Sequence, residues 1–221
     1  MAKRRFIFFD VGNTLLFPNR ARMLAPLSQD RHPTLAQWQA LERRTKHEFD
    51  ASMIGGKVDH GFWWTFHTYL LQDLQVSDDA MRDAFVVNTQ NSANWDQILP
   101  GTREALERIA SEYAIAVISN ADGRIDAVLR RCGIAECFVS ITDSGIVGHE
   151  KPHPAIFEAA LRGMKADPGE SLYVGDVYSV DYVGARNAGM DAVLFDVAGA
   201  YREREFPRVK SLEELEAWLK A

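Results

Sequence analysis

The hydrophobic residues of this chain fall into short continuous runs. These are FIFF at 6–9, AIAVI at 114–118, FVSIT at 138–142, SLYV at 171–174 and DAVLF at 191–195. Apolar runs of this length without polar alternation are typical of strands that are covered on both faces. The pattern therefore predicts five buried strands.

Apolar residues recur at helical spacing between these runs, at 102–113, 123–133, 154–164 and 180–190. Gly133 and Gly189 stand where C-terminal caps are expected. The last segment, 211–219, begins with a Ser that is followed three residues later by a Glu, which is the capping-box pattern. Strands that alternate with helices in this way predict an α/β fold with a Rossmann-like, doubly wound parallel sheet and right-handed connections.

Residues 15 to 95 interrupt the alternation. They contain helix-like segments around 34–53, 59–74 and 77–90, and no convincing strand. The segment SANWDQILPG, which includes Pro100 and Gly101, is typical of a return linker. The sequence therefore predicts two units, an α/β core of residues 1–14 and 96–221 and a helical cap of residues 15–95.

Bulk composition narrows the range of functions. The chain has 221 residues, of which 47% are hydrophobic, and this is enough for one sizeable core with an insertion. Its formal net charge is −6, and its basic residues are scattered. Nucleic-acid binding usually needs a basic face, so we expect no nucleic-acid partner. An anionic small molecule would have to be bound by a few local cations.

Neither targeting signals nor the cysteines point to a particular function. Only four apolar residues precede Asp10 in MAKRRFIFFD, whereas a secretory segment has roughly 7–15. No apolar stretch reaches the ~18 residues of a membrane span, so we expect a cytoplasmic protein without membrane contact. Cys132 and Cys137 lie among apolar residues without a second pair, which favours reduced core thiols over metal ligands.

Polar residues follow several of the predicted strands directly. Asp10 ends FIFFD, Ser119 and Asn120 end AIAVISN, and Asp176 ends SLYVGD, with Asp181 five residues on. The carboxyl ends of parallel strands meet at one edge of a sheet, where ligands bind. We therefore expect these side chains to gather there, together with Lys151 of HEKPHP.

Taken together, these segments resemble the haloacid dehalogenase-like hydrolase superfamily. The resemblance is carried by DVGNTLL, PGTREALERI, VISNAD, EKPHPAIFEAAL and YVGDVYSVDYVGARNAGM, with the insertion in the place of a C1-type cap. It implies that Asp10 is a nucleophile, that Ser119 and Lys151 hold and neutralise phosphoryl oxygens, and that Asp176 binds magnesium, with Asp181 as the second acid.

Elementary chemistry agrees with these implied roles. A carboxylate that attacks a phosphate ester approaches like charge, so the site needs cations. Mg²⁺ prefers oxygen ligands, for which Asp10, the backbone carbonyl of Gly12 and Asp176 are candidates. Asp181 is expected behind them, orienting water or Lys151. Asn120 is expected to hold either the phosphoryl group or the Ser119 loop, and Thr14 to cap the backbone near Asp10.

One position departs from the family pattern. Phosphatases of this superfamily have a second Asp two residues after the nucleophile, where this chain has Gly12. A positioned acid or base is worth ~10²–10⁴-fold in rate. Ordinary alkyl phosphates are therefore expected to be poor substrates.

The sequence is compatible with three functions. The first is a phosphatase for small phosphorylated metabolites with good leaving groups, such as acyl or aryl phosphates, or one whose acid comes from the cap or the substrate. The second is a haloacid dehalogenase or a phosphonatase; the latter needs a cap lysine, for which Lys46 and Lys57 are candidates by location. The third is a non-catalytic protein that binds phosphate or a metabolite.

The cap is expected to choose the substrate. Its arginines could reach an anion, although solvated helix faces are their expected place. Phe62, Phe66 and Tyr69 of the stripe GFWWTFHTYLL share one helical face, which predicts core packing. The histidines of this region lack paired spacing and are not expected to bind a metal. The arginines are Arg20, Arg22, Arg43 and Arg44, and the histidines are His32, His47, His60 and His67.

Overall fold

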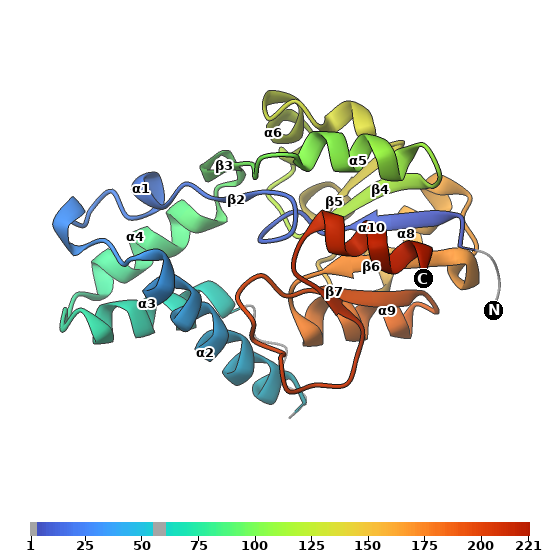
Figure 1. Ribbon diagram of the computed structural model, residues 1–221. Helices are drawn as coiled ribbons and strands as arrows, with labels where there is room; N and C mark the ends of the chain where they lie inside the picture. The colour runs from blue at the N-terminus through green and yellow to red at the C-terminus, as the bar shows by residue number, and fades with distance from the viewer. Residues whose placement is uncertain (1–3, 55–60) are drawn as a thin grey trace.

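A computed structural model describes residues 4–54 and 61–221 (Figure 1). Parallel strands form one sheet in the order β5-β4-β1-β6-β7-β8, with β1 between β4 and β6. The predicted α/β doubly wound sheet is therefore confirmed. Its strands are β1 (Phe6–Phe9), β4 (Ala114–Ser119), β5 (Ser140–Asp143), β6 (Ser171–Gly175), β7 (Asp191–Phe195) and β8 (Arg208–Val209).

Helices cover both faces of the sheet. Ile7 and Phe9 face a hydrophobic layer built with α5 (Thr102–Ala110), α6 (Ile125–Arg131) and α10 (Leu212–Lys220). Phe6 and Phe8 face the opposite layer, built with α8 (Pro154–Met164) and α9 (Val183–Asn187). Because every residue of β1 is buried on one face or the other, the strand reads as an unbroken apolar run.

The helices inserted after β1 lie to one side of the sheet (Figure 1). They pack on a small hydrophobic core of their own, in which Trp38, Phe66 and Phe85 are at most 4% exposed. Phe66 thus packs in a core, and the partly buried Tyr69 packs against it, as the helical spacing predicted. Phe62 is not part of this core and lines a cavity instead. These helices are α1 (Arg20–Met23), α2 (Leu35–Ile54), α3 (Phe62–Asp73) and α4 (Asp79–Gln90).

A two-stranded antiparallel ribbon joins the insertion to the core. It pairs β2 (Phe17–Pro18) with β3 (Trp95–Gln97). The prediction of no strand at the start of the insertion, and of a plain linker at its end, was therefore wrong. Strands of two or three residues have no detectable periodicity, and their pairing depends on contacts between segments that are far apart in sequence.

Several boundaries differ from the predicted ones. β5 begins at Ser140 rather than at 138, and Val139 before it is 72% exposed. The predicted helix at 180–190 is divided into a π-helical turn, Tyr178–Tyr182, and α9. The short helix α7 (Ser144–Val147) was not predicted. The caps behave as expected, since Gly133 and Gly189 have φ of 74° and 83°, and Ser211 accepts a hydrogen bond from Glu214 N.

Single-turn 3₁₀ helices connect some of these elements, at Gln29–Arg31, Ser92–Asn94, Ala135–Cys137 and Pro168–Glu170. Both cysteines are free and half-buried. Among the described residues, no helix combines the length and the hydrophobicity that a membrane span requires.

Candidate active site

The carboxyl edge of the central strands gathers the predicted acids and Ser119. Asp10 follows β1, Ser119 ends β4 and Asp176 follows β6. Their exposed fractions are 7%, 4% and 5%, respectively. Because β1 is paired with β4 on one side and β6 on the other, three segments that are distant in sequence meet around Asp10.

Lys151 points into the same cluster from the loop that precedes α8. Its Nζ lies 2.6 Å from Asp10 Oδ1, 2.8 Å from Asp181 Oδ1 and 2.8 Å from the Tyr173 hydroxyl oxygen. The Lys151 side chain is 2% exposed. A buried ammonium group is stable in this position because two carboxylates compensate its charge.

Asp181 organises the loop around it. Its Oδ2 accepts hydrogen bonds from the backbone N–H groups of Asp176 (3.0 Å) and Val177 (2.9 Å), while Oδ1 contacts Lys151. Only glycine fits at position 175, because a Cβ there would lie 2.5 Å from Asp181 Cγ. Both carboxylate oxygens of Asp181 already have partners, which suits the indirect role expected of it.

A lysine from the cap reaches Asp176. The Nζ of Lys46, on α2, lies 2.8 Å from Asp176 Oδ2 and 2.8 Å from Glu42 Oε1. The Lys46 side chain is 1% exposed. The sequence named Lys46 only by its location in the cap, because a lysine between polar helix positions gives no sign that it will be buried against another segment.

Further polar contacts join the same face of α2 to the core. Asp50 Oδ1 accepts a hydrogen bond from Ser179 N (3.0 Å), and Asp50 Oδ2 accepts one from the Tyr201 hydroxyl (2.8 Å). Arg43 donates to the backbone carbonyl of Ala198 (2.9 Å). The loop after β7 lies against α2 in Figure 1. Helix α2 is therefore anchored beside Asp176.

Burial dominates the ionisation of the cluster. It raises the pKa of Asp10 to about 6, although Lys151 opposes the shift. It raises the pKa of Asp176 to about 7, against the opposing effect of Lys46. Burial alone would lower the pKa of Lys151, but Asp10 and Asp181 raise it above the usual range. The two lysines thus offset only part of the effect of burial on the pKa values of Asp10 and Asp176. A further cation would stabilise the ionised form of these carboxylates.

The donor set is compatible with a hard divalent cation. Asp10, Asp176 and Asp181 each offer a carboxylate oxygen, and these oxygens lie within 4.8 Å of one another. All three donors are oxygens, which Mg²⁺ prefers, and Mg²⁺ usually keeps several waters besides one or two carboxylates. Because both oxygens of Asp181 accept other bonds, Asp10 and Asp176 are the donors best suited to direct contact.

Asn120 has a loop-stabilising role close to the expected one, whereas Thr14 does not form the expected cap. Asn120 Oδ1 accepts a hydrogen bond from Lys151 N (2.7 Å), and Asn120 Nδ2 donates to Lys151 O (3.0 Å). This pair of bonds agrees with a loop-stabilising role, although the loop is that of Lys151 and not of Ser119. The Thr14 hydroxyl is buried without a hydrogen-bond partner among the described residues, so the expected cap is not formed.

Gly12 lies beside an indole ring. A Cβ added at Gly12 would lie 3.4 Å from the six-membered ring of Trp95. Trp95 is 8% exposed, and its Nε1 donates a hydrogen bond to the backbone carbonyl of Thr89 (2.7 Å). A methyl group at position 12 would therefore be in van der Waals contact with this ring. No local pattern in the sequence indicates this neighbour.

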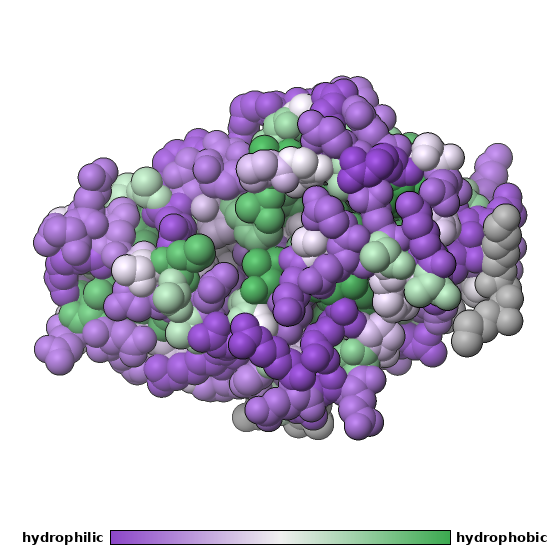
Figure 2. Space-filling model, in the orientation of Figure 1, coloured by the Kyte–Doolittle hydropathy of each residue, from purple (hydrophilic) through white to green (hydrophobic). Residues whose placement is uncertain are grey.

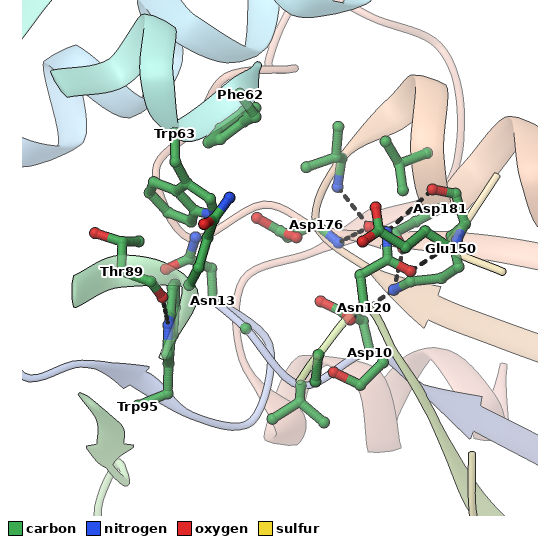
Figure 3. Close-up of a pocket in the computed structure, with 18 of the residues that line it drawn as sticks. Asp10, Asn13, Phe62, Trp63, Thr89, Trp95, Asn120, Glu150, Asp176 and Asp181 are labelled. Atoms are coloured by element: carbon green, nitrogen blue, oxygen red, sulfur yellow. Dashed lines mark hydrogen bonds and ion pairs between the residues drawn. The ribbon is translucent and has the colours of Figure 1, made fainter. Parts of the chain in front are cut away.

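A cavity of about 480 Å³ adjoins the cluster. Its walls include Asp10, Ser119, Lys151 and Asp176 from the core, and Trp63 from the cap. Figure 3 shows the aromatic side chains on one side of this space and most of the acids on the other. The volume lies within the range of about 300–1,000 Å³ that is typical of small-molecule sites.

The cap arginines considered in the sequence do not line this cavity. Arg22 pairs with Asp96, and Arg44 lies 3.5 Å from the centre of the Tyr69 ring. Arg20 lies over the Trp38 ring, and Arg43 contacts the core as described above. Arg22 and Arg44 are exposed, as expected, whereas Arg20 and Arg43 are half-buried.

His67 is a core residue. Its Nε2 lies 2.8 Å from Thr89 Oγ1, and burial lowers its pKa to about 3, so the ring is neutral. His32 and His47 contact the backbone carbonyls of Leu27 and Ala200. The remaining candidates, His60 and Lys57, lie outside the described residues.

Residues 5–189 match the family model of haloacid dehalogenase-like hydrolases. The chain is similar to haloacid dehalogenase-like hydrolase domain-containing protein 3 of Homo sapiens, with 30% identity over 86% of this chain and 81% of that protein. It is also similar to glyceraldehyde 3-phosphate phosphatase of Pyrococcus abyssi, with 34% identity over 86% of this chain and 81% of that protein.

The fold is similar to that of YfnB, a hydrolase of Bacillus subtilis whose crystal structure contains magnesium. The TM-score is 0.71, with 19% identity over 99% of this chain and 100% of the other. At this identity the likeness concerns the fold alone.

Proposed function

Since the chain belongs to the haloacid dehalogenase-like hydrolase family, we propose that it is a Mg²⁺-dependent phosphatase of small phosphorylated metabolites that uses Asp10 as its nucleophile. The observation that carries this proposal is the buried group of Asp10, Asp176 and Asp181 with Lys151 Nζ 2.6 Å from Asp10. Relatives named glyceraldehyde 3-phosphate phosphatase support phosphate chemistry.

Asp10, Asp176 and the backbone carbonyl of Gly12 would hold the magnesium ion. When bound, the ion supplies positive charge against the phosphoryl oxygens and keeps the buried carboxylates ionised. Asp181 holds the Asp176 loop by accepting hydrogen bonds from the backbone N–H groups of that loop, and it orients Lys151. Ser119 and Lys151 bind phosphoryl oxygens.

The reaction proceeds in two displacements at phosphorus. An Asp10 carboxylate oxygen forms a bond to phosphorus while the bond to the leaving oxygen breaks, and that oxygen takes the electron pair. Water then attacks the aspartyl-phosphate, its oxygen and protons leave with inorganic phosphate, and the Asp10 carboxylate is restored. Lys151 stabilises negative charge in both steps, because its ammonium group is fixed before reaction.

The identity of residue 12 selects the leaving group. An alkoxide needs a proton as it departs, and no carboxyl group is present at position 12. A carboxylate or phenolate leaves without one. Acyl and aryl phosphates are therefore the expected substrates, and alkyl phosphates are expected to be slower by ~10²-fold or more.

Residues 15–95 act in this proposal as a cap over the core of residues 1–14 and 96–221. The β2–β3 ribbon forms both connections between them. A cap in this position excludes water from the reacting centre and contacts the leaving group.

The test is phosphate release over a panel of acyl, aryl and alkyl phosphates, with Mg²⁺ and with chelator. We expect release from acyl and aryl phosphates that requires Mg²⁺ and exceeds the Asp10→Asn background. Binding of phosphate without release from any member would favour the non-catalytic alternative. Metal-independent halide release from haloacids would favour a dehalogenase.

The phosphonatase alternative depends on a neutral cap lysine. Burial lowers the pKa of Lys46, but Asp176 and Glu42 raise it well above its ordinary value, so this lysine is protonated. An ammonium group cannot add to an aldehyde, and Lys46 is therefore a poor candidate for imine formation. Borohydride trapping of a phosphonoaldehyde on Lys46 would contradict this argument.

A Gly12→Asp variant tests the effect of the missing acid. We expect the single variant to raise alkyl phosphate turnover less than ~10-fold, because the Cβ of the new side chain already contacts the Trp95 ring, which restricts the positions open to its carboxyl group. A Gly12→Asp/Trp95→Phe variant lacks the nearest ring atoms and should gain more, toward ~10²-fold. Gly12→Ala is the matched control, since it adds the methyl group alone. A ~10²-fold gain in the single variant would show that Trp95 does not limit the space.

A further inference from the structure

The cavity beside Asp10 has a continuous aromatic wall. The ring centroids of Phe49 and Phe62 are 5.5 Å apart, those of Phe62 and Trp63 are 5.0 Å apart, and those of Trp63 and Trp95 are 5.4 Å apart. All four residues line the cavity. Their edge-to-face packing holds the rings in place, so an apolar surface is present before any ligand binds.

This wall lies opposite the reacting centre. Figure 3 shows Phe62, Trp63 and Trp95 across the open space from Asp10 and Asp181. In Figure 2, hydrophobic side chains are visible near the middle of a surface that is otherwise mostly hydrophilic. A group attached to a phosphoryl unit at Asp10 would extend toward these rings.

The described lining of the cavity carries its positive charge at the reacting centre. Of the lining residues that the structure describes, only Lys151 is a lysine or arginine, and Asp10 and Asp181 already contact its Nζ. The other charged residues of this described lining are acids, among them Asp122. Within the described lining, a group attached to the phosphoryl unit therefore meets an aromatic surface and no second lysine or arginine.

Asp122 remains ionised. Burial alone would raise its pKa, but hydrogen bonds from Arg124 and Ser92 lower it. Ser92 Oγ donates to Asp122 Oδ1 at 2.6 Å, and Arg124 Nη2 donates to Oδ2 at 2.5 Å. The guanidinium of Arg124, which is not among the lining residues, thus compensates the Asp122 carboxylate and is engaged there.

We propose that the leaving group of this enzyme has an aromatic or extended apolar surface, which packs against Phe62, Trp63 and Trp95. This inference rests on the proposed function, because it places the transferred phosphoryl group at Asp10. Aromatic acyl phosphates and aryl phosphates are then the expected substrate class. An acyclic triose phosphate has no ring face to offer to this wall.

Benzoyl phosphate and acetyl phosphate form the matched substrate pair. Both are acyl phosphates that release a carboxylate, so the chemistry at phosphorus is the same and only the ring differs. In the holoenzyme with Mg²⁺, we expect kcat/KM for benzoyl phosphate to exceed that for acetyl phosphate by ~10-fold or more. Glyceraldehyde 3-phosphate should be slower than both. Equal values for the acyl pair would overturn the inference.

Adjacent tryptophans provide a matched pair of variants. Trp63 lines the cavity, whereas Trp64 is 48% exposed and lies under the Arg82 guanidinium on another face of α3. Trp63→Ala is expected to lower the benzoyl-to-acetyl ratio by ~5-fold or more, and Trp64→Ala to leave it unchanged. Each ratio is measured within one protein preparation, so partial loss of folded protein cancels. An equal effect of both variants would contradict a specific ring contact.

Binding of phosphonates separates this inference from the proposed function. Benzylphosphonate and methylphosphonate cannot be hydrolysed, and calorimetry with Mg²⁺ present measures their affinities directly. A benzyl preference of ~10-fold or more, lost in Trp63→Ala, would support the aromatic site even if no phosphate ester is turned over. Phosphate release from acyl phosphates without a benzyl preference would leave the phosphatase proposal standing and remove the aromatic leaving group.

Discussion

A Lys151→Met variant is expected to lose about 3–5 kcal/mol of unfolding free energy, as a buried ion pair does when one partner is removed. Methionine fills a similar volume but leaves Asp10 and Asp181 without the ammonium group that now lies 2.6 Å and 2.8 Å from them. Denaturant unfolding in chelator measures this loss, because no metal ion then compensates the carboxylates. Lys210→Met, at an exposed lysine, is the control and should change stability by at most about 0.5 kcal/mol.

The same variant is expected to lose about 10²–10³-fold in kcat/KM, the usual effect of removing one preorganised donor from a transition state. Burial has already raised the pKa of Asp10 to about 6, and Lys151 opposes that shift. Without Lys151 the pKa rises further, so less of the nucleophile is ionised at neutral pH. The activity loss should therefore shrink as the assay pH is raised. A Lys151→Met enzyme with native stability and native turnover would contradict both roles.

A Lys46→Met variant is expected to lose stability by a similar amount, about 3–5 kcal/mol. Its Nζ is the cation shared by Asp176 and Glu42, at 2.8 Å from each, and the site is almost closed to water. Removal of the charge leaves two buried carboxylates, one in the core and one in the cap. Unfolding in chelator is again the measurement, with Lys210→Met as control.

Two further readouts separate charge compensation from lost packing. Glu42→Gln added to Lys46→Met should recover part of the stability, because one uncompensated carboxylate disappears. Mg²⁺ should stabilise Lys46→Met more than it stabilises the native protein, since the ion gives Asp176 a new counter-charge. Equal Mg²⁺ shifts in the two proteins would argue against a metal ligand at Asp176.

The position of Lys46 connects the cap to the chemistry of the core. Helix α2 brings Lys46 to Asp176 and Asp50 to Ser179, so it holds the loop after β6 at two points. In the proposed mechanism this loop positions a magnesium ligand. Changes in cap placement are then expected to alter magnesium affinity as well as the choice of substrate.

Much of the core could be predicted from the chain itself. A strand buried on both faces must be apolar throughout, and this requirement revealed β1, β4, β6 and β7 directly. The acids that follow those strands were placed correctly at one edge, because the carboxyl ends of neighbouring parallel strands coincide. β8 escaped detection, since a two-residue strand carries no pattern.

The cap was harder to predict in detail. Its three long helices were recognised from spacing, but Lys46 was named only by its location, and Trp95 was not recognised as part of the site. Both act through contacts with residues that are remote in sequence, Asp176 in one case and Gly12 in the other. Neither contact leaves a local signature.

The amino-acid sequence by itself determined the sheet, the family and the acids of the site, because each depends on local periodicity or on what directly follows a strand. Only the tertiary structure decided which charges neutralise which acids, and which surface faces the leaving group. Those properties arise where the cap meets the core, and the free energy of a buried charge or ring depends on its neighbours in space.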